Sequence, residues 1–324
     1  MAFSAWCLLA TSTLSAQGGC GSVCLPLEAI DPERPQLRNQ QLRVFSTTEY
    51  SRFDNFREGG ESVTNPGENE ATISLTTNFF EYAFFDRFTA SFLVPYVHKV
   101  QKTNRFGKRV ASGFGDVSLF GRFEIVSRQL RNDLSLSVGL GVKFPTGGIE
   151  EPLTDQSRLP PAFQIGSGAY DLIPTVSYYQ NFLKFSLFGN SFVRLPLEEN
   201  KFGYRFGREY EFHFGLQYPL SFWGRRVELL GSLDTLIGEH DTDSEQMLPG
   251  RLREGTKVLN TGGRFLNLTP GLRVRLTREF AVQGRVFIPV LEDWHGLRAR
   301  NVGQVAPDLT FQLSVAYRFN LNQF

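Results

Sequence analysis

The chain alternates apolar and polar residues over many short stretches. One such stretch is "LSLSVGLGVKF", residues 134–144. Its apolar residues occupy every second position: Leu134, Leu136, Val138, Leu140, Val142 and Phe144. A strand has a side-chain period of two and places all six on one face, whereas a helix would scatter them. The opposite face holds only Ser, Gly and Lys. The stretch is therefore predicted to be a β-strand with one apolar face.

The same alternation recurs along the chain. It is clear in "YEFHFGLQY" (210–218), "LNLTPGLRVRL" (266–276) and "LTFQLSVAYRF" (309–319). Weaker versions lie near 41–50, 71–83, 88–99, 115–126, 170–180, 183–195, 227–238 and 280–290. Together these stretches predict about twelve strands.

The predicted connections alternate in length. Short turns are expected near 84–87, 127–133, 181–182, 219–226 and 277–279. Long polar loops are expected near 51–70, 100–112, 145–169, 196–206, 239–264 and 292–307. Short connections at one end and long ones at the other indicate an antiparallel up-and-down meander. Bacterial outer-membrane barrels have this layout, with short periplasmic turns and longer extracellular loops.

The less apolar face of the strands separates a membrane barrel from a soluble one. It carries Gly, Ser and isolated charged residues on nearly every strand, and a dry core would hold those charges only at a high desolvation cost. Inward glycines such as Gly139 and Gly141 are expected to leave room in a narrow lumen. In lipid every backbone polar group needs a partner within the protein, so the sheet must close. The predicted fold is all-β, a closed antiparallel transmembrane β-barrel; a soluble lipocalin-like barrel is the alternative.

Composition and the N-terminus support export. The chain has 31 Phe but two Met, which favours strands, and a net charge of +1, which argues against a nucleic-acid partner. Residues 1–16 are predicted to be a signal peptide, although no Lys or Arg precedes their apolar core. Residues 17–40 are then a periplasmic segment and 41–324 the barrel. The expected location is the Gram-negative outer membrane, with its lipid and the barrel-assembly machinery as partners.

The cysteines lie near the N-terminus. Cys7 falls within the predicted signal peptide, which leaves Cys20 and Cys24. In an oxidising exported compartment a disulfide between these two is the default expectation. A metal pair and a lipid anchor on Cys20 are the alternatives. No cofactor or resident metal is expected.

Charged residues at inward positions are the predicted lumen lining: Arg43, Glu211, His213, Glu228, Asp234, Arg273, Arg275, Arg285 and Arg318. Glu228 is expected at the depth of Arg273 and Arg275 and should pair with them. Arg285 and Arg318 have no inward acid on their own strands. They either form a positive patch that favours anionic solutes or are neutralised across a narrow barrel.

Four segments resemble a known family. They are "LVPYV" (93–97), "GFGDVSLFGRFEI" (113–125), "GLGVKFPTGG" (139–148) and "GSGAYDLIPTVSYY" (166–179). In this order they resemble the outer-membrane transporters linked to meta-pathway phenol degradation. The resemblance implies a barrel of about twelve strands that passes small solutes, aromatic or apolar ones among them. The C-terminal assembly signal expected of such a barrel would comprise Tyr317, Phe319 and Phe324, although the in-phase position 323 is Gln.

Catalysis is not expected. A phospholipase-like hydrolase would need a serine near a histidine, and His98 with Ser112 is the available pair, without that family's sequence context. His240 lies in the acidic loop "GEHDTDSE", which is interpreted as a solvated loop rather than a cation site. The main prediction is a channel for small solutes. A receptor or structural partner of an envelope complex is the alternative.

Overall fold

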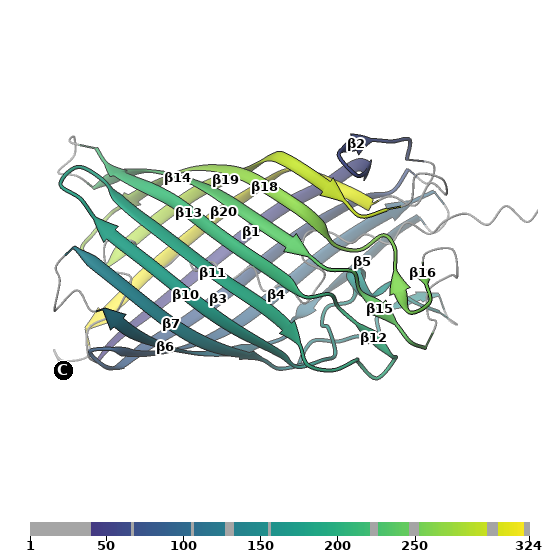
Figure 1. Ribbon diagram of the computed structural model, residues 1–324, viewed down its shortest axis with the longest axis horizontal. Helices are drawn as coiled ribbons and strands as arrows, with labels where there is room; N and C mark the ends of the chain where they lie inside the picture. The colour runs from purple at the N-terminus through teal and green to yellow at the C-terminus, as the bar shows by residue number, and fades with distance from the viewer. Residues whose placement is uncertain are drawn as a thin grey trace, which may run out of the picture.

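A computed structural model describes residues 40–65, 68–104, 107–126, 133–154, 157–220, 226–245, 253–296 and 304–320. Over these residues a single antiparallel sheet closes on itself, because β1 (Gln41–Glu58) pairs with β20 (Gln304–Asn320) on one edge and with β3 (Glu70–Phe85) on the other. Figure 1 shows the resulting cylinder, with its strands tilted to the long axis. The Cys20–Cys24 pair, the predicted signal peptide and Phe324 lie outside the described residues.

The described part of the wall has twelve strand positions, which confirms the predicted fold. After β1 and β3 they are β4 (Phe88–Thr103), β5 with β6 (Gly107–Phe114 and Ser118–Val126), β7 (Leu134–Lys143), β10 (Asp171–Asn181), β11 (Ser186–Pro196), β13 (Glu209–Pro219), β14 (Val227–Gly238), β18 (Gly263–Arg275), β19 (Phe280–Trp294) and β20.

Short elements decorate the loop end of the barrel. Strand β2 (Glu61–Ser62) returns along β1, and β8 (Pro152–Thr154) pairs with β9 (Ser157–Arg158) ahead of the short helix η2 (Pro161–Phe163). A second sheet contains β12 (Tyr204–Arg205), β15 (Thr242–Asp243), β17 (Lys257–Val258) and β16 (Arg253–Glu254). No helix in the described ranges is long and apolar enough to cross a membrane.

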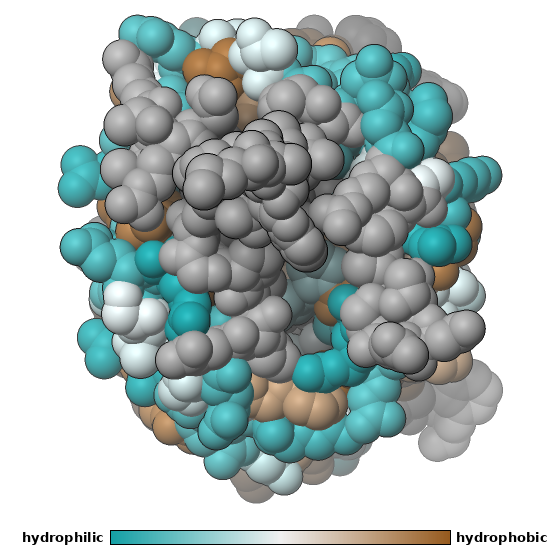
Figure 2. All heavy atoms as spheres, turned by 90° about the vertical axis from the view of Figure 1, so that its right-hand side faces the viewer, coloured by the Kyte–Doolittle hydropathy of each residue, from teal (hydrophilic) through white to brown (hydrophobic). Residues whose placement is uncertain are grey.

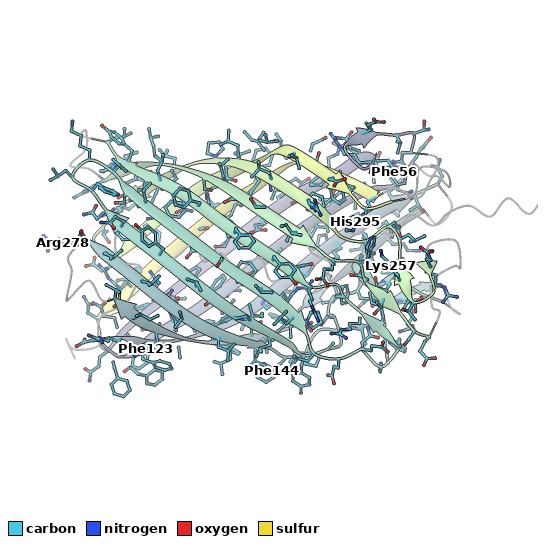
Figure 3. The ribbon with its side chains drawn as sticks, viewed as in Figure 1. Phe56, Phe123, Phe144, Lys257, Arg278 and His295 are labelled. Atoms are coloured by element: carbon cyan, nitrogen blue, oxygen red, sulfur yellow. The ribbon has the colours of Figure 1, made fainter. Side chains whose placement is uncertain are left out.

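Burial follows the period of two. On β7, Val138 and Leu140 are exposed on the outside, whereas Ser135, Ser137 and Lys143 are buried inside. Phe123 and Phe144 project outward from the wall (Figure 3). Tyr317 and Phe319 also face outward, near the C-terminal end of β20. The apolar face of the strands therefore meets lipid and the small or polar face lines the interior.

Several predicted loops are wrong in extent. Strand β1 continues to Glu58, and β4 and β5 leave only a short connection between Thr103 and Gly107. Most of 51–70 and 100–112 is therefore strand. Strand β19 likewise continues to Trp294, which shortens the predicted 292–307 loop. Polar side chains predicted loops here, but a strand that projects beyond the membrane keeps its backbone pairing while its outward face becomes polar.

The inward glycines do not all leave open space. A Cβ placed on Gly141 would collide with the ring of Phe120, which lies flat against this part of the wall. A Cβ on Gly139 would meet Thr175 Oγ1 at 2.5 Å. The expectation that these glycines widen the lumen is wrong at both positions, because neighbouring side chains fill the space.

One wall position is broken. Both β5 and β6 pair with β4, β5 beside Tyr96–Thr103 and β6 beside Phe88–Leu93. Strand β7 pairs with β6 but ends at Lys143, opposite Ser118. Among the described residues no strand pairs with the second edge of β5. The chain leaves the wall at this point, and the described residues 147–154 and 157–167 are called the inward segment below.

Replacing Leu140 with Arg tests the outward assignment. Leu140 is 51% exposed in the middle of the apolar face. Leu140→Arg should destabilise the vesicle-inserted barrel and lower its free energy of unfolding by about 2–4 kcal/mol if the position lies at the bilayer midplane. Denaturant titration of the vesicle-inserted protein measures this change. Leu140→Met is the matched control and should be nearly neutral; equal stability of the Arg and Met variants would contradict the assignment.

Candidate functional site: the barrel lumen and the inward segment

The inward segment packs against the inner wall with its own apolar side chains. Leu159, Phe163 and Ile165 are buried in one cluster with side chains from five strands. The wall residues of that cluster are Phe53, Phe56, Ala71, Val97, Ala111 and Val305. The buried Lys99 of β4 adds polar contacts, because its Nζ donates to the carbonyls of Ala162 at 2.8 Å and Gln164 at 3.2 Å. The segment is thereby held inside the loop end of the lumen.

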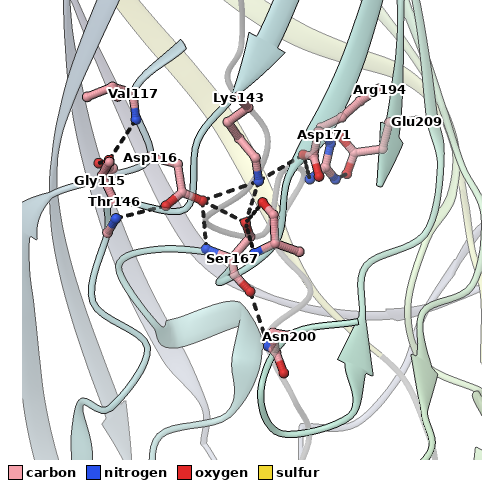
Figure 4. Close-up of polar contacts among 12 residues, drawn as sticks. Gly115, Asp116, Val117, Lys143, Thr146, Ser167, Asp171, Arg194, Asn200 and Glu209 are labelled. Carbon is pink, nitrogen blue, oxygen red and sulfur yellow. Dashed lines mark hydrogen bonds and ion pairs between the residues drawn. The ribbon is translucent and has the colours of Figure 1, made fainter. Parts of the chain in front are cut away.

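One carboxylate binds both ends of the inward segment (Figure 4). Asp116 lies in the break between β5 and β6. Its Oδ1 accepts a hydrogen bond from the backbone of Gly147 at 2.9 Å, and its Oδ2 accepts one from the backbone of Ser167 at 2.8 Å. The Ser167 hydroxyl donates to the same Oδ2 at 2.6 Å. Gly147 begins the segment and Ser167 ends it, so Asp116 closes it into a compact loop.

Lys143 connects this carboxylate to the opposite side of the break. Its buried Nζ lies 3.2 Å from Asp116 Oδ2 and 2.8 Å from Asp171 Oδ2. Asp171 in turn lies 3.5 Å from Arg194, which binds Glu209 with an Nε–Oε2 distance of 3.0 Å. The chain of alternating charges runs from β7 through β10 and β11 to β13. Such a buried network is stable only when its charges are paired.

Two glycines make the closure possible. A Cβ on Gly147 would lie 2.7 Å from the Cα of Gly166, so the two ends of the segment are in backbone contact. The same Cβ would lie 3.1 Å from Asp116 Oδ1. Backbone approach this close requires residues without side chains. The paired glycines and Asp116 together form the base of the inward segment.

Below the inward segment the lumen has an apolar side. Six buried residues from six strands form one cluster there: Phe45, Phe79, Leu93, Phe120, Ile173 and Phe192. The rings of Phe45 and Phe79 stack with centroids 4.1 Å apart. The strands that carry them are β1, β3, β4, β6, β10 and β11, which occupy one arc of the closed sheet. This cluster is called the apolar arc.

Charged residues line β13, β14, β18 and β19, where no comparable apolar cluster of described residues lies at this depth; the strands of the apolar arc carry charges as well, such as the Arg43–Glu81 pair. His213 lies between two acids, with Nδ1 3.1 Å from Asp234 and Nε2 3.5 Å from Glu211. The Arg285 guanidinium lies 4.0 Å from Asp234 and also binds the Ser232 hydroxyl. The acid beside Arg285 therefore comes from a strand two positions away in the sheet, as in the alternative of neutralisation across a narrow barrel.

The predicted pairing of Glu228 is present. Glu228 lies directly opposite Arg273 in the ladder, with an Oε2–Nη1 distance of 3.6 Å, and it also pairs with Arg275. Arg318 faces Arg43 across the β1–β20 ladder and donates to the carbonyl of Arg278 at 2.8 Å. Arg43 itself binds Glu81, with an Nε–Oε2 distance of 2.6 Å. All nine predicted lining residues thus occupy inward positions, and each makes a close polar contact with another group of the protein.

Sequence reasoning missed the charged residues on the strands of the apolar arc. It also missed the contact between Asp116 and Lys143 at the base of the inward segment, which is called the latch below. Glu81, Arg122 and Glu124 lie at inward positions near the short-turn end, where Arg122 is 3.9 Å from Glu81. Their alternation with outward apolar residues was the available signal. Asp116 and Lys143 lay within stretches quoted for the family resemblance, but their pairing depends on the path of the inward segment.

The residues considered for hydrolysis lie outside the lumen. His98 is directly opposite Ser112 in the β4–β5 ladder. Both are exposed at outward positions. Within the described residues no group of three or more His, Cys, Asp or Glu side chains is arranged to hold a metal ion.

The loop end is polar and tied together by histidines. Figure 2 shows mainly hydrophilic side chains among the described residues around this end. The rings of His240 and His295 stack with centroids 4.0 Å apart. Their Nδ1 atoms bond to backbone carbonyls, that of Val258 at 3.0 Å and that of Thr261 at 2.9 Å. The stack joins the loop after β14 to the loop after β19.

The closed sheet, its apolar exterior and its polar interior define the chain as a β-barrel of the bacterial outer membrane. No family profile and no curated protein sequence matches it. The solved structures it is similar to include the COG4313 outer membrane channel from Pseudomonas putida F1, with a TM-score of 0.66 and 14% identity over 88% of this chain and 97% of that one. The β-domain of the Bordetella autotransporter BrkA matches with a TM-score of 0.50 and 10% identity, over 87% and 100%. These likenesses show the fold.

Breaking the Arg43–Glu81 pair should destabilise the barrel. Both side chains are almost fully buried, so Arg43→Met leaves a buried carboxylate with only the Ser91 hydroxyl at 3.2 Å and the more distant Arg122 at 3.9 Å. The expected loss in folding free energy is about 3 kcal/mol, the lower end of the range for a broken buried pair. Arg52→Met is the control, because Arg52 pairs with Asp54 at 3.1 Å on an exposed surface, and it should cost less than about 1 kcal/mol. Similar losses in both variants would refute the buried assignment.

The histidine stack should depend on pH. Burial, and secondly the charge of His295, lower the pKa of His240 from 6.5 to about 4. An unfolded loop therefore binds this proton more readily than the folded one, so the stack is fully stable above about pH 6.5 and weakens as the pH falls toward 4. The hydrogen-exchange protection factors of residues 253–262, in which the intrinsic pH dependence of exchange is divided out, should fall over this interval. His240→Phe keeps an aromatic ring without the titration and should remove the pH dependence; an unchanged profile in that variant would contradict this cause.

Proposed function

We propose that the chain is an outer-membrane channel for small aromatic solutes that carry a polar group, and that the inward segment is its gate. The observation that carries the proposal is the two-sided lumen. The apolar arc offers Phe45, Phe79 and Phe120, and the opposite arc offers paired charges and hydroxyl groups. A ring can pack on the first side while its polar substituent forms hydrogen bonds on the second.

Charge selectivity is not part of the proposal. The inward basic residues are matched by acids: Arg43 with Glu81, Arg273 and Arg275 with Glu228, and Arg285 with Asp234. Paired charges cancel most of each other's field, which supports neutralisation over a positive patch. Uncharged phenol-like solutes therefore suit the lumen better than carboxylates do. This agrees with the resemblance to transporters linked to phenol degradation, which stays a prediction.

The gate follows from the packing. The inward segment fills the loop end of the lumen with Phe163 and Ile165, so solute passes only when the segment moves. Its base is held by Asp116 and Lys143 rather than by a strand ladder. Side-chain contacts of this kind can be broken one at a time, whereas a ladder separates cooperatively. The latch is therefore the expected point of opening.

Flux into liposomes tests both parts of the proposal. Liposomes that contain the purified protein and an entrapped β-glucosidase are supplied with phenyl β-D-glucoside or methyl β-D-glucoside, and released glucose is measured. The phenyl compound should enter faster, because only its ring packs on the apolar arc. Lys143→Met should increase the flux several-fold by loosening the base of the segment. Lys102→Met is the control, since Lys102 pairs with Glu70 on an exposed surface and neither residue belongs to the inward segment.

The outcomes separate the alternatives. Equal entry of the two glucosides would contradict the aromatic preference while leaving a channel. Equal flux in Lys143→Met and Lys102→Met would contradict the latch. No flux above protein-free liposomes in any variant would refute transport and favour a receptor or a structural role.

A further inference from the structure

Strand β3 reverses the pattern of the rest of the wall. In its loop-side half the outward residues are Thr72, Ser74, Thr76 and Asn78, all four half-buried, whereas the short-turn half presents Phe80, Tyr82 and Phe84. Its inward residues include Ile73, Leu75 and Phe79, which pack in the apolar clusters of the interior. On the strand two positions away, β20, the outward residues are Leu309, Phe311, Leu313 and Val315. Strand β3 therefore presents polar side chains to lipid, whereas β20 presents apolar ones.

The reversal extends across the ladder to β1. Asn78 lies opposite Ser46, and Thr76 lies opposite Thr48 with their hydroxyl oxygens 2.9 Å apart. Ser74 is the next outward residue on β3. These five side chains, Ser46, Thr48, Ser74, Thr76 and Asn78, are called the polar wall patch.

The patch lies within the apolar belt. Phe80 and Phe92 are exposed on its short-turn side. Tyr50 and Tyr96 are exposed beside it, opposite Ser74 and Thr76 in the two ladders. Exposed aromatic side chains on three strands therefore border the patch. Thr76 and Asn78 also fall near the middle of β3, which spans Glu70–Phe85. Hydroxyl and amide groups at this depth find no hydrogen-bond partner in lipid chains, and that arrangement is costly.

The chemistry of the patch indicates its occupant. None of its five side chains is charged, and each both donates and accepts hydrogen bonds. Such a surface is complementary to a copy of itself. A two-fold axis along the membrane normal at β3 would bring Asn78 and Thr76 against the same residues of another chain, in an isologous contact. The surrounding aromatic side chains would then supply the apolar rim that excludes lipid from the hydrogen bonds.

We infer that the polar wall patch is an interface at which a second copy of this chain packs in the membrane. The inference does not depend on what the lumen transports. It assigns Asn78 to the centre of the contact and predicts a homodimer with the lumens side by side.

Cysteine cross-linking in native outer membranes tests the interface. Asn78→Cys is placed in a background whose Cys7, Cys20 and Cys24 are Ser, and disulfides are formed with a mild oxidant. Leu233→Cys is the control, because Leu233 is an exposed outward residue near the middle of β14, on the other side of the barrel. The Asn78→Cys chain should run as a covalent dimer and the Leu233→Cys chain as a monomer. Monomers in both, equal cross-linking in both, or a cross-link to a different protein would overturn the inference.

A second measurement separates association from folding. The triple variant Thr48→Leu, Thr76→Leu, Asn78→Leu should fold, because its new side chains match those on the other outward faces. Heat-modified gel mobility reports whether the barrel has closed. Native mass spectrometry should then show dimers for the natural chain and monomers for the folded triple variant. An unchanged dimer fraction, or a monomeric natural chain, would refute the interface.

Discussion

The buried carboxylate of Asp116 is the contact on which the interior arrangement depends. It accepts hydrogen bonds from Gly147 and Ser167, the two ends of the inward segment, and pairs with the buried Lys143. A carboxylate withdrawn from water is tolerated only when its oxygens are satisfied, so the ends of the segment are drawn to it. It occupies the one place where β5 and β6 interrupt the wall strand, and there the barrel exchanges a backbone ladder for side-chain contacts.

Closure of the sheet imposes the second constraint. The apolar arc lies across the lumen from the paired charges of β13, β14, β18 and β19. At the loop end, the inward segment packs against β1, β3, β4, β5 and β20. The apolar arc stabilises the wall and also shapes the space that a solute would enter. The paired charges hold their strands in register across the ladders, as the Glu228–Arg273 contact does between β14 and β18. The residues that stabilise the wall are therefore also those to which the proposed solute preference is assigned.

Much of the wall was predictable from the period of two. The outward row Leu136, Val138 and Leu140 is local information, and so is the inward position of Glu228. Strand ends were less predictable, because the polar residues beyond the membrane at Glu58 and Thr103 do not distinguish strand from loop. Arg285 and Asp234 were not paired in advance, because their contact spans an intervening strand and requires the register of both ladders.

The inward segment was beyond sequence reasoning for a different reason. Its path depends on Phe163 and Ile165 finding Phe53 and Val97, which lie far away in the chain. The stretches that carried the family resemblance contain Asp116, Lys143, Gly147 and Ser167, yet nothing local shows that these four meet. The reversed pattern of β3 is present in "ATISLTTNFF". Its weak alternation predicts a strand but does not show which of its two faces meets lipid.

The inward segment is proposed to control passage through the lumen. A disulfide between this segment and β5 would prevent its movement. Positions 113 and 165 are close enough for one, because a Cβ on Gly113 would lie 3.7 Å from Ile165 Cγ2. Gly113→Cys with Ile165→Cys, in a background without the native cysteines, would fasten the segment to β5. Phenyl glucoside flux into liposomes should fall to the protein-free level under oxidation and return on reduction. Flux that is the same in the oxidised and reduced protein would contradict the account.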